Sequence, residues 1–198
     1  MLDIAQINKD WTLFLDRDGV INDDKSPYTL NAEQFDFYPG VPEAIADLGK
    51  IFKYVIITTN QRGVGRNLMT ENDLQLIHDK LQTGVTAAGG SITAIYYCTA
   101  INNDHPNRKP NPGMAFQAMQ DYKDIDPART IIVGNNISDM QFGRNAGIHT
   151  VLVHSTGTKV NEPHELVDLQ FENLPAFAEA LKKVKGNNRT DNGEQRTN

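Results

Sequence analysis

Two aspartates separated by one residue, Asp16 and Asp18, are the first residues in this sequence with types and spacing suited to a chemical reaction. They follow a short apolar run and precede Gly19, which lets the backbone turn sharply after an extended segment. In extended chain, residues i and i+2 point the same way. One carboxylate could therefore attack phosphorus while the other handles the proton of the leaving group. Taken alone, such a pair is equally typical of a turn.

A phosphate dianion repels carboxylates, so such a site also needs positive charge. Lys109 and a divalent metal ion would supply it, and Mg²⁺ prefers carboxylate, substrate and water oxygens as ligands. Thr59 can donate a hydrogen bond to a phosphoryl oxygen. Singly, such a threonine is typical of a strand, and a lysine before proline is typical of a solvated surface. Their combination, in this order along the chain, favours a reaction site.

These residues need a scaffold that brings them together. Short apolar, β-branched runs predict strands over residues 12–15, 54–58, 92–97, 130–133, 150–153 and 167–171. Helical patterns between and after them cover residues 41–51, 70–87, 112–122, 138–146 and 173–184. This alternation predicts an α/β fold with a mainly parallel sheet and helices on both faces. Ligands bind such a sheet at the carboxyl ends of its strands, where the candidate residues would meet.

The ends of the elements and the segments between them complete the expected fold. Thr70 is a suitable N-cap, with Asp73 three residues on in a capping-box position. Residues 1–184 are expected to form a single domain, followed by a flexible polar tail over 185–198, which lacks apolar side chains. Long connections over 22–39 and 99–110 are expected to form the rim of the site. They leave no room for a sizeable cap domain.

The composition argues against several classes of protein. Of 198 residues, 25 are acidic and 19 basic, and the net charge of -6 argues against binding nucleic acid by bulk charge. No apolar run of about 18 residues predicts a membrane span, and the first residues lack the pattern of a signal peptide. A cytoplasmic location is therefore expected. Cys98 is the only cysteine, which excludes an intrachain disulfide and a cysteine-rich zinc site.

Five short segments resemble motifs of the haloacid dehalogenase (HAD) superfamily of phosphatases. The segment FLDRDGVIN, residues 14–22, resembles the first motif of that superfamily. The others narrow the resemblance to the branch that holds the heptose bisphosphate phosphatases and the histidinol-phosphate phosphatases. They are TNQRGVGR (59–66), YYC (96–98), RKPNPGM (108–114) and VGNNISDM (133–140). The resemblance covers residues 12–181 and implies a Rossmann-like HAD fold.

The resemblance implies a role for each matching residue. Asp16 would be the nucleophile that forms an aspartyl-phosphate, and Asp18 would be the general acid and base. Thr59 would hold the phosphoryl group and Lys109 would neutralise it. The residues expected near the substrate are Asn60, Gln61 and Arg108, with Arg62 and Arg66 as basic candidates at the rim. The residues expected to hold Mg²⁺ are Asp16, Asp18 through its main-chain carbonyl, Asn135 and Asp139.

Two departures from the family pattern matter. The fourth motif usually reads Gly-Asp-x-x-x-Asp, whereas Asn135 replaces the first aspartate here. Its amide oxygen can bind Mg²⁺ but carries no negative charge, or the side chain could instead cap the following helix.

The second departure concerns zinc. Many relatives carry a zinc loop with three cysteines and a histidine, whereas this chain has only Cys98 and His105. Structural zinc needs about four ligands, so no structural zinc is expected.

The sequence therefore predicts a Mg²⁺-dependent phosphomonoesterase of carbohydrate metabolism that hydrolyses a small sugar phosphate through an aspartyl-phosphate. A heptose bisphosphate is the first candidate substrate and histidinol phosphate is the second. A polynucleotide 3′-phosphatase would share a similar Thr-Asn-Gln segment, but the acidic charge counts against it. The missing charge at Asn135 would also suit an inactive binding or regulatory protein. The expected partner is a small phosphorylated metabolite, not nucleic acid or a membrane, and the expected state is a monomer.

Overall fold

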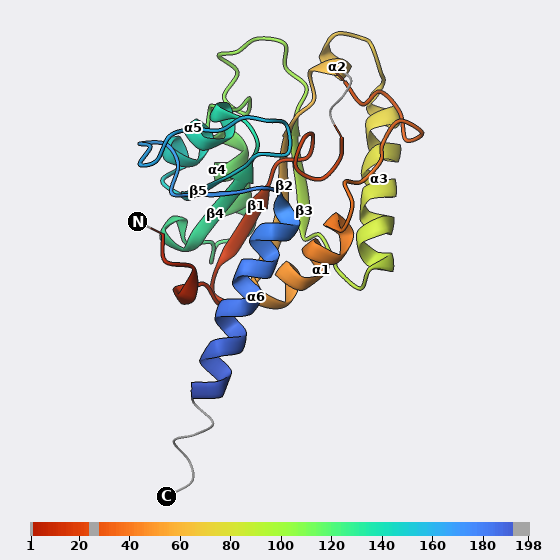
Figure 1. Ribbon diagram of the computed structural model, residues 1–198. Helices are drawn as coiled ribbons and strands as arrows, with labels where there is room; N and C mark the ends of the chain where they lie inside the picture. Colours follow the sequence, from red (N-terminus) through yellow and green to blue (C-terminus); the bar gives the residue numbers. More distant parts are fainter. Residues whose placement is uncertain (1, 24–27, 192–198) are drawn as a thin grey trace, which may run out of the picture.

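The structure, a computed structural model, describes residues 2–23 and 28–191, with side chains to residue 186 (Figure 1). Within these residues, six strands form one sheet in the order β3-β2-β1-β4-β5-β6, and every neighbouring pair is parallel. The strands are β1 (Thr12–Leu15), β2 (Tyr54–Asn60), β3 (Ala94–Cys98), β4 (Thr130–Gly134), β5 (His149–Val153) and β6 (Leu169–Phe171). Each apolar run that predicts a strand overlaps one, with ends that differ by up to two residues, which confirms the α/β class with a parallel sheet.

The register aligns the carboxyl ends of the three central strands. β1 pairs with β2 on one side and with β4 on the other, so that Leu15 lies opposite both Ile57 and Val133. The N–H of Asp16 extends this pairing by donating a hydrogen bond to the carbonyl of Val133, at 3.0 Å. The residues that follow these strands therefore emerge at one edge of the sheet, as the alternation of elements predicts.

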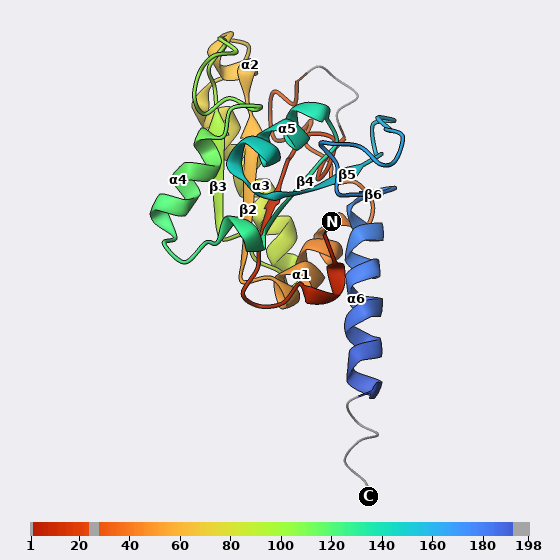
Figure 2. The ribbon, with the colours of Figure 1, turned by 90° about the vertical axis from the view of Figure 1, so that its left-hand side faces the viewer.

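Helices cover both faces of the sheet, as expected (Figure 2). Leu13 and Leu15 pack with α1, α3 and α6 on one face, whereas Phe14 packs with α4 and α5 on the other. This alternation follows from the period of two along a strand, and burial of both faces explains why Leu13, Phe14 and Leu15 are all apolar. The helices are α1 (Val41–Ile51), α3 (Glu71–Ala87), α4 (Gly113–Asp121), α5 (Ile137–Ala146) and α6 (Leu174–Asp191).

Helix α3 begins where its sequence predicts. Oγ1 of Thr70 accepts a hydrogen bond from the N–H of Asp73, and the Asp73 carboxylate accepts one from the N–H of Thr70. This reciprocal pair is the predicted capping box. The sequence does not predict three short elements, because a single turn is too short to show an apolar period. They are the 3-10 turns η1 (Ile4–Gln6) and η2 (Pro127–Arg129) and the helix α2 (Arg62–Gly65).

Helix α6 is longer than the sequence predicts. It continues to Asp191, so residues 185–191, which the sequence predicts to belong to the polar tail, are helical. Phe177 and Leu181 bury the first turns of α6, and a helix that is already formed adds further residues without needing an apolar face. The rest of the expected tail, 192–198, lies outside the described residues. No helix in the described part of the chain is long and apolar enough to cross a membrane.

Candidate active site

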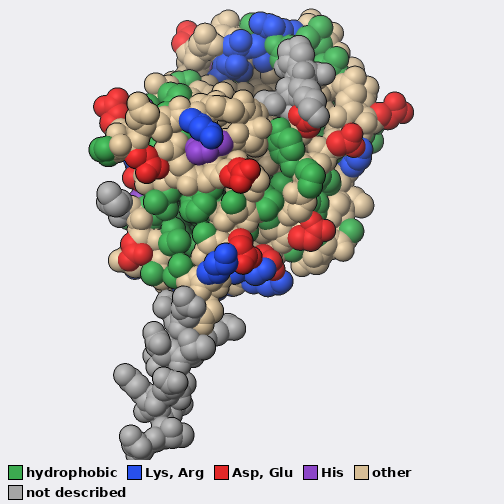
Figure 3. All heavy atoms as spheres, in the orientation of Figure 1, with side chains coloured by type: hydrophobic (Ala, Val, Ile, Leu, Met, Phe, Trp, Pro, Cys, Tyr) green, Lys and Arg blue, Asp and Glu red, His purple; other side chains and the backbone are tan. Residues whose placement is uncertain are grey.

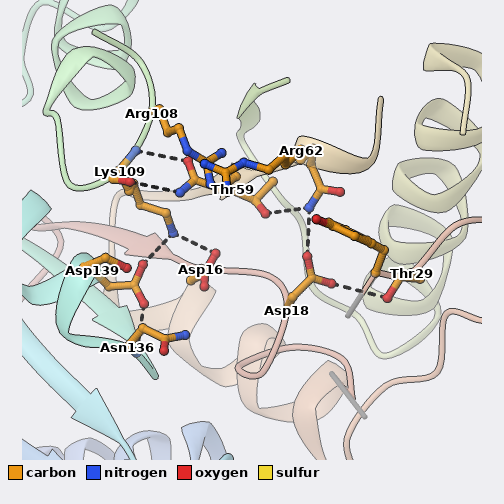
Figure 4. Close-up of a pocket in the computed structure, with 13 residues that line it drawn as sticks. Asp16, Asp18, Thr29, Thr59, Arg62, Arg108, Lys109, Asn136 and Asp139 are labelled. Carbon is orange, nitrogen blue, oxygen red and sulfur yellow. Dashed lines mark hydrogen bonds and ion pairs between the residues drawn. The ribbon is translucent and has the colours of Figure 1, made fainter. Parts of the chain in front are cut away.

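A pocket of about 300 Å³ opens at the carboxyl edge of the sheet, where β1, β2 and β4 end (Figure 4). Among the described residues, connecting loops and the short helix α2 cover this edge, in agreement with the expectation of no sizeable cap domain. Figure 3 shows Lys and Arg side chains grouped beside a hollow at the top of the molecule. All predicted site residues line the pocket except Asn135 and the rim candidate Arg66. The lining consists of Asp16, Asp18, Tyr28, Thr29, Thr59, Asn60, Gln61, Arg62, Arg108, Lys109, Asn136, Ser138 and Asp139.

Lys109 joins two carboxylates at the floor of the pocket. Its Nζ lies 2.7 Å from Oδ1 of Asp16 and 2.7 Å from Oδ1 of Asp139, and the residue is 4% exposed. Burial opposes the positive charge, but Asp139 and Asp16 outweigh it and raise the pKa of Lys109 above its ordinary value. Lys109 is therefore a fixed cation directly beside the predicted nucleophile.

Asp16 is a buried carboxyl group, 8% exposed. Burial raises the pKa of Asp16 to about 7 despite the opposing effect of Lys109, and the neighbouring Asp139 adds to the rise. The ionised form of Asp16 therefore needs more positive charge than Lys109 alone provides. A divalent metal ion next to Asp16 would supply that charge.

Arg17 and two amides hold Asp18 in place. Nη2 of Arg17 lies 2.8 Å from Oδ1 and 2.9 Å from Oδ2 of Asp18. The side chain of Asn22 donates to Oδ1 at 3.0 Å, and that of Gln61 donates to Oδ2 at 2.8 Å. Burial opposes ionisation, but Arg17 and these hydrogen bonds lower the pKa of Asp18 below its ordinary value. In this arrangement Asp18 is a carboxylate, the form that can accept a proton from water.

Arg17 is a site residue that the sequence does not single out. It is fully buried, and its guanidinium lies against Asp18 rather than in the pocket. An arginine between two aspartates gives no signal of its own in a single sequence. Its role is visible only once the fold shows that its permanent charge is buried and therefore needs a partner.

The side-chain amides of Asn60 and Gln61 form hydrogen bonds with other groups of the protein. Asn60 exchanges two hydrogen bonds with the main chain of Lys109, from Nδ2 to the carbonyl at 3.1 Å and from the N–H to Oδ1 at 3.0 Å. Nε2 of Gln61 donates to Oγ1 of Thr59 and to Asp18, each at 2.8 Å. Thr59 thus keeps its own O–H as a donor. Asn60 and Gln61 position these groups, and their contact with a substrate stays a prediction.

Three arginines lie near the mouth of the pocket. Arg62 and Arg108 donate hydrogen bonds to main-chain carbonyls of the 99–110 loop, and Arg66 donates to the hydroxyl of Tyr28 at 2.7 Å. Burial and the nearby charge of Arg62 lower the pKa of Arg108. None of the three forms an ion pair with a carboxylate in the described residues. Among the described residues, no carboxylate therefore offsets their positive charge.

The fourth motif places Asn136, not Asn135, at the start of α5. The N–H of Asn136 donates to Oδ2 of Asp139 at 3.0 Å, so the alternative that Asn135 caps this helix is wrong. Asn135 is instead fully buried against the turn after β1, where a Cβ on Gly19 would collide with its amide. Gly19 has a φ of 82°, so both its backbone conformation and this close approach require glycine.

The oxygen atoms that directly follow β1 and β4 fit Mg²⁺. Asp16 offers a carboxylate, and Oδ1 of Asn135 is a buried acceptor without a hydrogen-bond partner. Both oxygens of Asp139 already have partners, Lys109 and the N–H of Asn136. No group of three or more His, Cys, Asp or Glu side chains in the described part of the chain is arranged to hold a metal ion. A Mg²⁺ site here therefore depends on amide and main-chain oxygens as well as on carboxylates.

Cys98 and His105 are neighbours at the end of β3. Sγ of the buried Cys98 lies 3.6 Å from Nδ1 of His105. Two such ligands are fewer than the four that structural zinc requires. The absence of structural zinc stays a prediction.

The sequence matches the HAD-hydrolase-like family over residues 106–179. A D-glycero-alpha-D-manno-heptose-1,7-bisphosphate 7-phosphatase of Mycobacterium bovis is 32% identical over 178 residues, which cover 89% of this chain and 94% of that protein. The D-glycero-beta-D-manno-heptose-1,7-bisphosphate 7-phosphatase of Escherichia coli K12 is 31% identical, with 86% and 93% covered. The crystal structure of D,D-heptose 1,7-bisphosphate phosphatase from B. bronchiseptica, complexed with magnesium and phosphate, superposes with a TM-score of 0.77 at 31% identity, covering 87% of this chain and 98% of that one.

Proposed function

We propose, since this chain belongs to the heptose-1,7-bisphosphate 7-phosphatase family of the HAD superfamily, that it removes the 7-phosphate of D-glycero-D-manno-heptose 1,7-bisphosphate with the aid of Mg²⁺. Family membership makes the chain a HAD-type phosphatase, a phosphoric monoester hydrolase, and confirms the resemblance of its motifs. The observation that supports the proposed reaction most directly is the meeting of Asp16, Asp18, Thr59 and Lys109 in one pocket.

The proposed reaction has two steps at phosphorus. A carboxylate oxygen of Asp16 attacks, the acyl-phosphate bond forms, and the bond from phosphorus to the sugar oxygen breaks. Asp18 must first take up a proton when the phosphate binds; it gives this proton to the leaving sugar oxygen and, as a carboxylate again, takes one from the water that hydrolyses the aspartyl-phosphate. Arg17 favours the carboxylate form of Asp18, but the negative charge of an incoming phosphate opposes this effect and favours protonation.

The remaining residues of the pocket balance charge around the phosphoryl group. Lys109 stabilises negative charge on it, and the O–H of Thr59 is free to donate to one of its oxygens. The candidates to hold Mg²⁺ are Asp16, the main-chain carbonyl of Asp18, and Oδ1 of Asn135, with Asp139 in support through Lys109. When bound, Mg²⁺ would offset the charge of the phosphate and favour the ionised form of Asp16.

The three arginines at the mouth favour a substrate with a second anionic group. Arg62, Arg66 and Arg108 are without carboxylate partners in the described residues, so they suit the 1-phosphate of a bisphosphate. Histidinol phosphate carries an ammonium group, which these cations would repel. This difference favours the heptose bisphosphate over the second candidate.

The polynucleotide and non-catalytic alternatives have weaker support. The net charge of -6 remains unfavourable for a polynucleotide substrate. A non-catalytic protein would not need a buried ion pair between Lys109 and Asp16, since such a pair costs desolvation. We also propose that the enzyme works in the cytoplasm as a monomer, with a small phosphorylated metabolite rather than nucleic acid or a membrane as its partner.

Steady-state kinetics on a panel of phosphates tests this proposal. We expect kcat/KM for the heptose bisphosphate to exceed that for histidinol phosphate and for a 3′-phosphorylated oligonucleotide by at least about a hundredfold. Turnover of p-nitrophenyl phosphate should require Mg²⁺. If kcat/KM for histidinol phosphate exceeded that for the heptose bisphosphate, histidinol phosphate would become the proposed substrate. If no phosphate were hydrolysed in the presence of Mg²⁺, the result would favour a non-catalytic protein.

A further inference from the structure

The amide of Asn135 has two ends with different surroundings. Nδ2 donates a hydrogen bond to Oγ1 of Thr156, at 3.0 Å, whereas Oδ1 is buried and has no hydrogen-bond partner. Buried polar atoms in proteins nearly always have partners, so an orphaned acceptor beside a reaction site points to a ligand. Asn135 directly follows β4, and its Cγ and Nδ2 lie against Gly19, in the turn after Asp16 and Asp18.

An asparagine must be oriented to serve a metal ion, unlike an aspartate. Both oxygens of a carboxylate can bind a cation, but only one end of an amide can, and the other end bears two N–H donors. An amide turned the wrong way would point N–H groups at the cation. The residue that accepts a hydrogen bond from Nδ2 therefore decides which end of Asn135 faces the site.

We propose that Thr156 is a positioning residue that fixes the orientation of the Asn135 amide, so that Oδ1 is free to bind Mg²⁺. Thr156 belongs to the segment after β5 and lies 21 residues from Asn135 in the sequence. Its neighbour Ser155 donates a hydrogen bond to the carbonyl of Gly19. The segment after β5 thus connects directly to the two loops that carry the predicted metal ligands.

This inference rests on the proposed function, because it concerns the same Mg²⁺ site. Hydrogen-bond partners that orient metal ligands usually change metal affinity by about 10- to 100-fold when they are removed. Loss of the Thr156 hydroxyl should therefore change the affinity for Mg²⁺ itself, which can be measured without substrate.

Calorimetric titration of Mg²⁺ into the substrate-free protein tests the proposal, with the Mg²⁺-induced shift in melting temperature as a second readout. Thr156→Val keeps the side-chain shape but removes the acceptor, and we expect it to raise the Kd for Mg²⁺ about tenfold. Thr156→Ser should retain wild-type affinity, as should the matched control Thr158→Val in the same loop. In an Asn135→Asp background, which needs no amide orientation, adding Thr156→Val should not change the Kd.

Three results would overturn the proposal. An unchanged Kd in Thr156→Val, with a raised Kd in Asn135→Ala, would mean that Asn135 binds Mg²⁺ without help from Thr156. Unchanged Kd values in both variants would remove Asn135 from the metal site. An equal loss of affinity from Thr156→Val in the wild-type and Asn135→Asp backgrounds would mean that Thr156 acts through the loop and not through the amide. None of these results bears on turnover of the heptose bisphosphate, which tests the proposed function separately.

Discussion

Asp16 and Asp18 lie two residues apart, yet their surroundings shift their acidities in opposite directions. Burial raises the pKa of Asp16 to about 7, whereas Arg17 lowers the pKa of Asp18 against the effect of burial. Asp16 therefore needs added positive charge to ionise, while Asp18 is held as a base. These separate environments let two identical side chains take different roles in one reaction.

Asp16→Asn should abolish turnover with little effect on the fold. The amide keeps the shape of the side chain but removes the attacking charge, and loss of a nucleophile costs several orders of magnitude in rate. The measurement is kcat for p-nitrophenyl phosphate, with circular dichroism as a control for folding. A variant that retains a tenth of wild-type turnover would show that Asp16 is not the nucleophile.

Asp18→Asn should lower kcat by about 10²–10⁴-fold, the usual range for a positioned proton donor. The loss should be larger for a sugar phosphate than for p-nitrophenyl phosphate, because p-nitrophenolate leaves with little protonation. Equal losses for the two substrates, measured side by side, would count against Asp18 as the acid.

At the scale of elements, the features that the sequence predicts best are those set by local patterns, such as the bounds of helices and strands. The bounds of β1 and α1 could be predicted to the residue, because an apolar run and a helical period each end clearly there. The parallel register then brings Asp16, Thr59 and the fourth motif to one edge. The pairing of Asn60 with Lys109 could not be predicted, because it joins residues 49 positions apart and depends on the path of a loop. The pairing of Asn135 with Thr156, 21 positions apart, could not be predicted for the same reason. Arg17 pairs with its neighbour Asp18, but only the fold shows that its charge is buried.

The loop between β3 and α4 should hold no zinc. It brings Cys98 and His105 into contact, but two ligands do not make a structural zinc site. Protein purified without added zinc should contain well under one zinc per chain by metal analysis. A zinc chelator, added with excess Mg²⁺, should leave the melting temperature unchanged. Stoichiometric, tightly held zinc would contradict this reading of the loop.

At the scale of the whole molecule, the buried His78 on α3 should make folding stability depend on pH. It is 3% exposed, and its Nε2 has no hydrogen-bond partner. Burial, with a smaller contribution from Arg17, lowers the pKa of His78 to about 4, whereas an unfolded histidine titrates near pH 6.5. Between these values the unfolded chain binds the extra proton, so the free energy of unfolding should fall as the pH drops from about 7 to 4, by up to about 3 kcal/mol.

Urea denaturation of wild type and His78→Gln at pH 7 and pH 5 measures this effect. The variant removes the titrating group, so its stability should fall less between the two values. His105→Gln, which changes an exposed histidine, is the matched control and should behave as wild type. Equal pH dependence in wild type and His78→Gln would exclude His78 as its source.

The central claim is that the pocket at the carboxyl edge of the sheet hydrolyses the 7-phosphate of the heptose bisphosphate through Asp16. Phosphorus NMR during turnover of D-glycero-D-manno-heptose 1,7-bisphosphate with Mg²⁺ tests it most directly, because the two ester phosphates and free phosphate give separate signals. We predict that the 7-phosphate signal decays as inorganic phosphate appears, that the 1-phosphate signal persists, and that Asp16→Asn leaves the spectrum unchanged. Loss of the 1-phosphate first, or no release of phosphate by the wild-type enzyme, would contradict the claim.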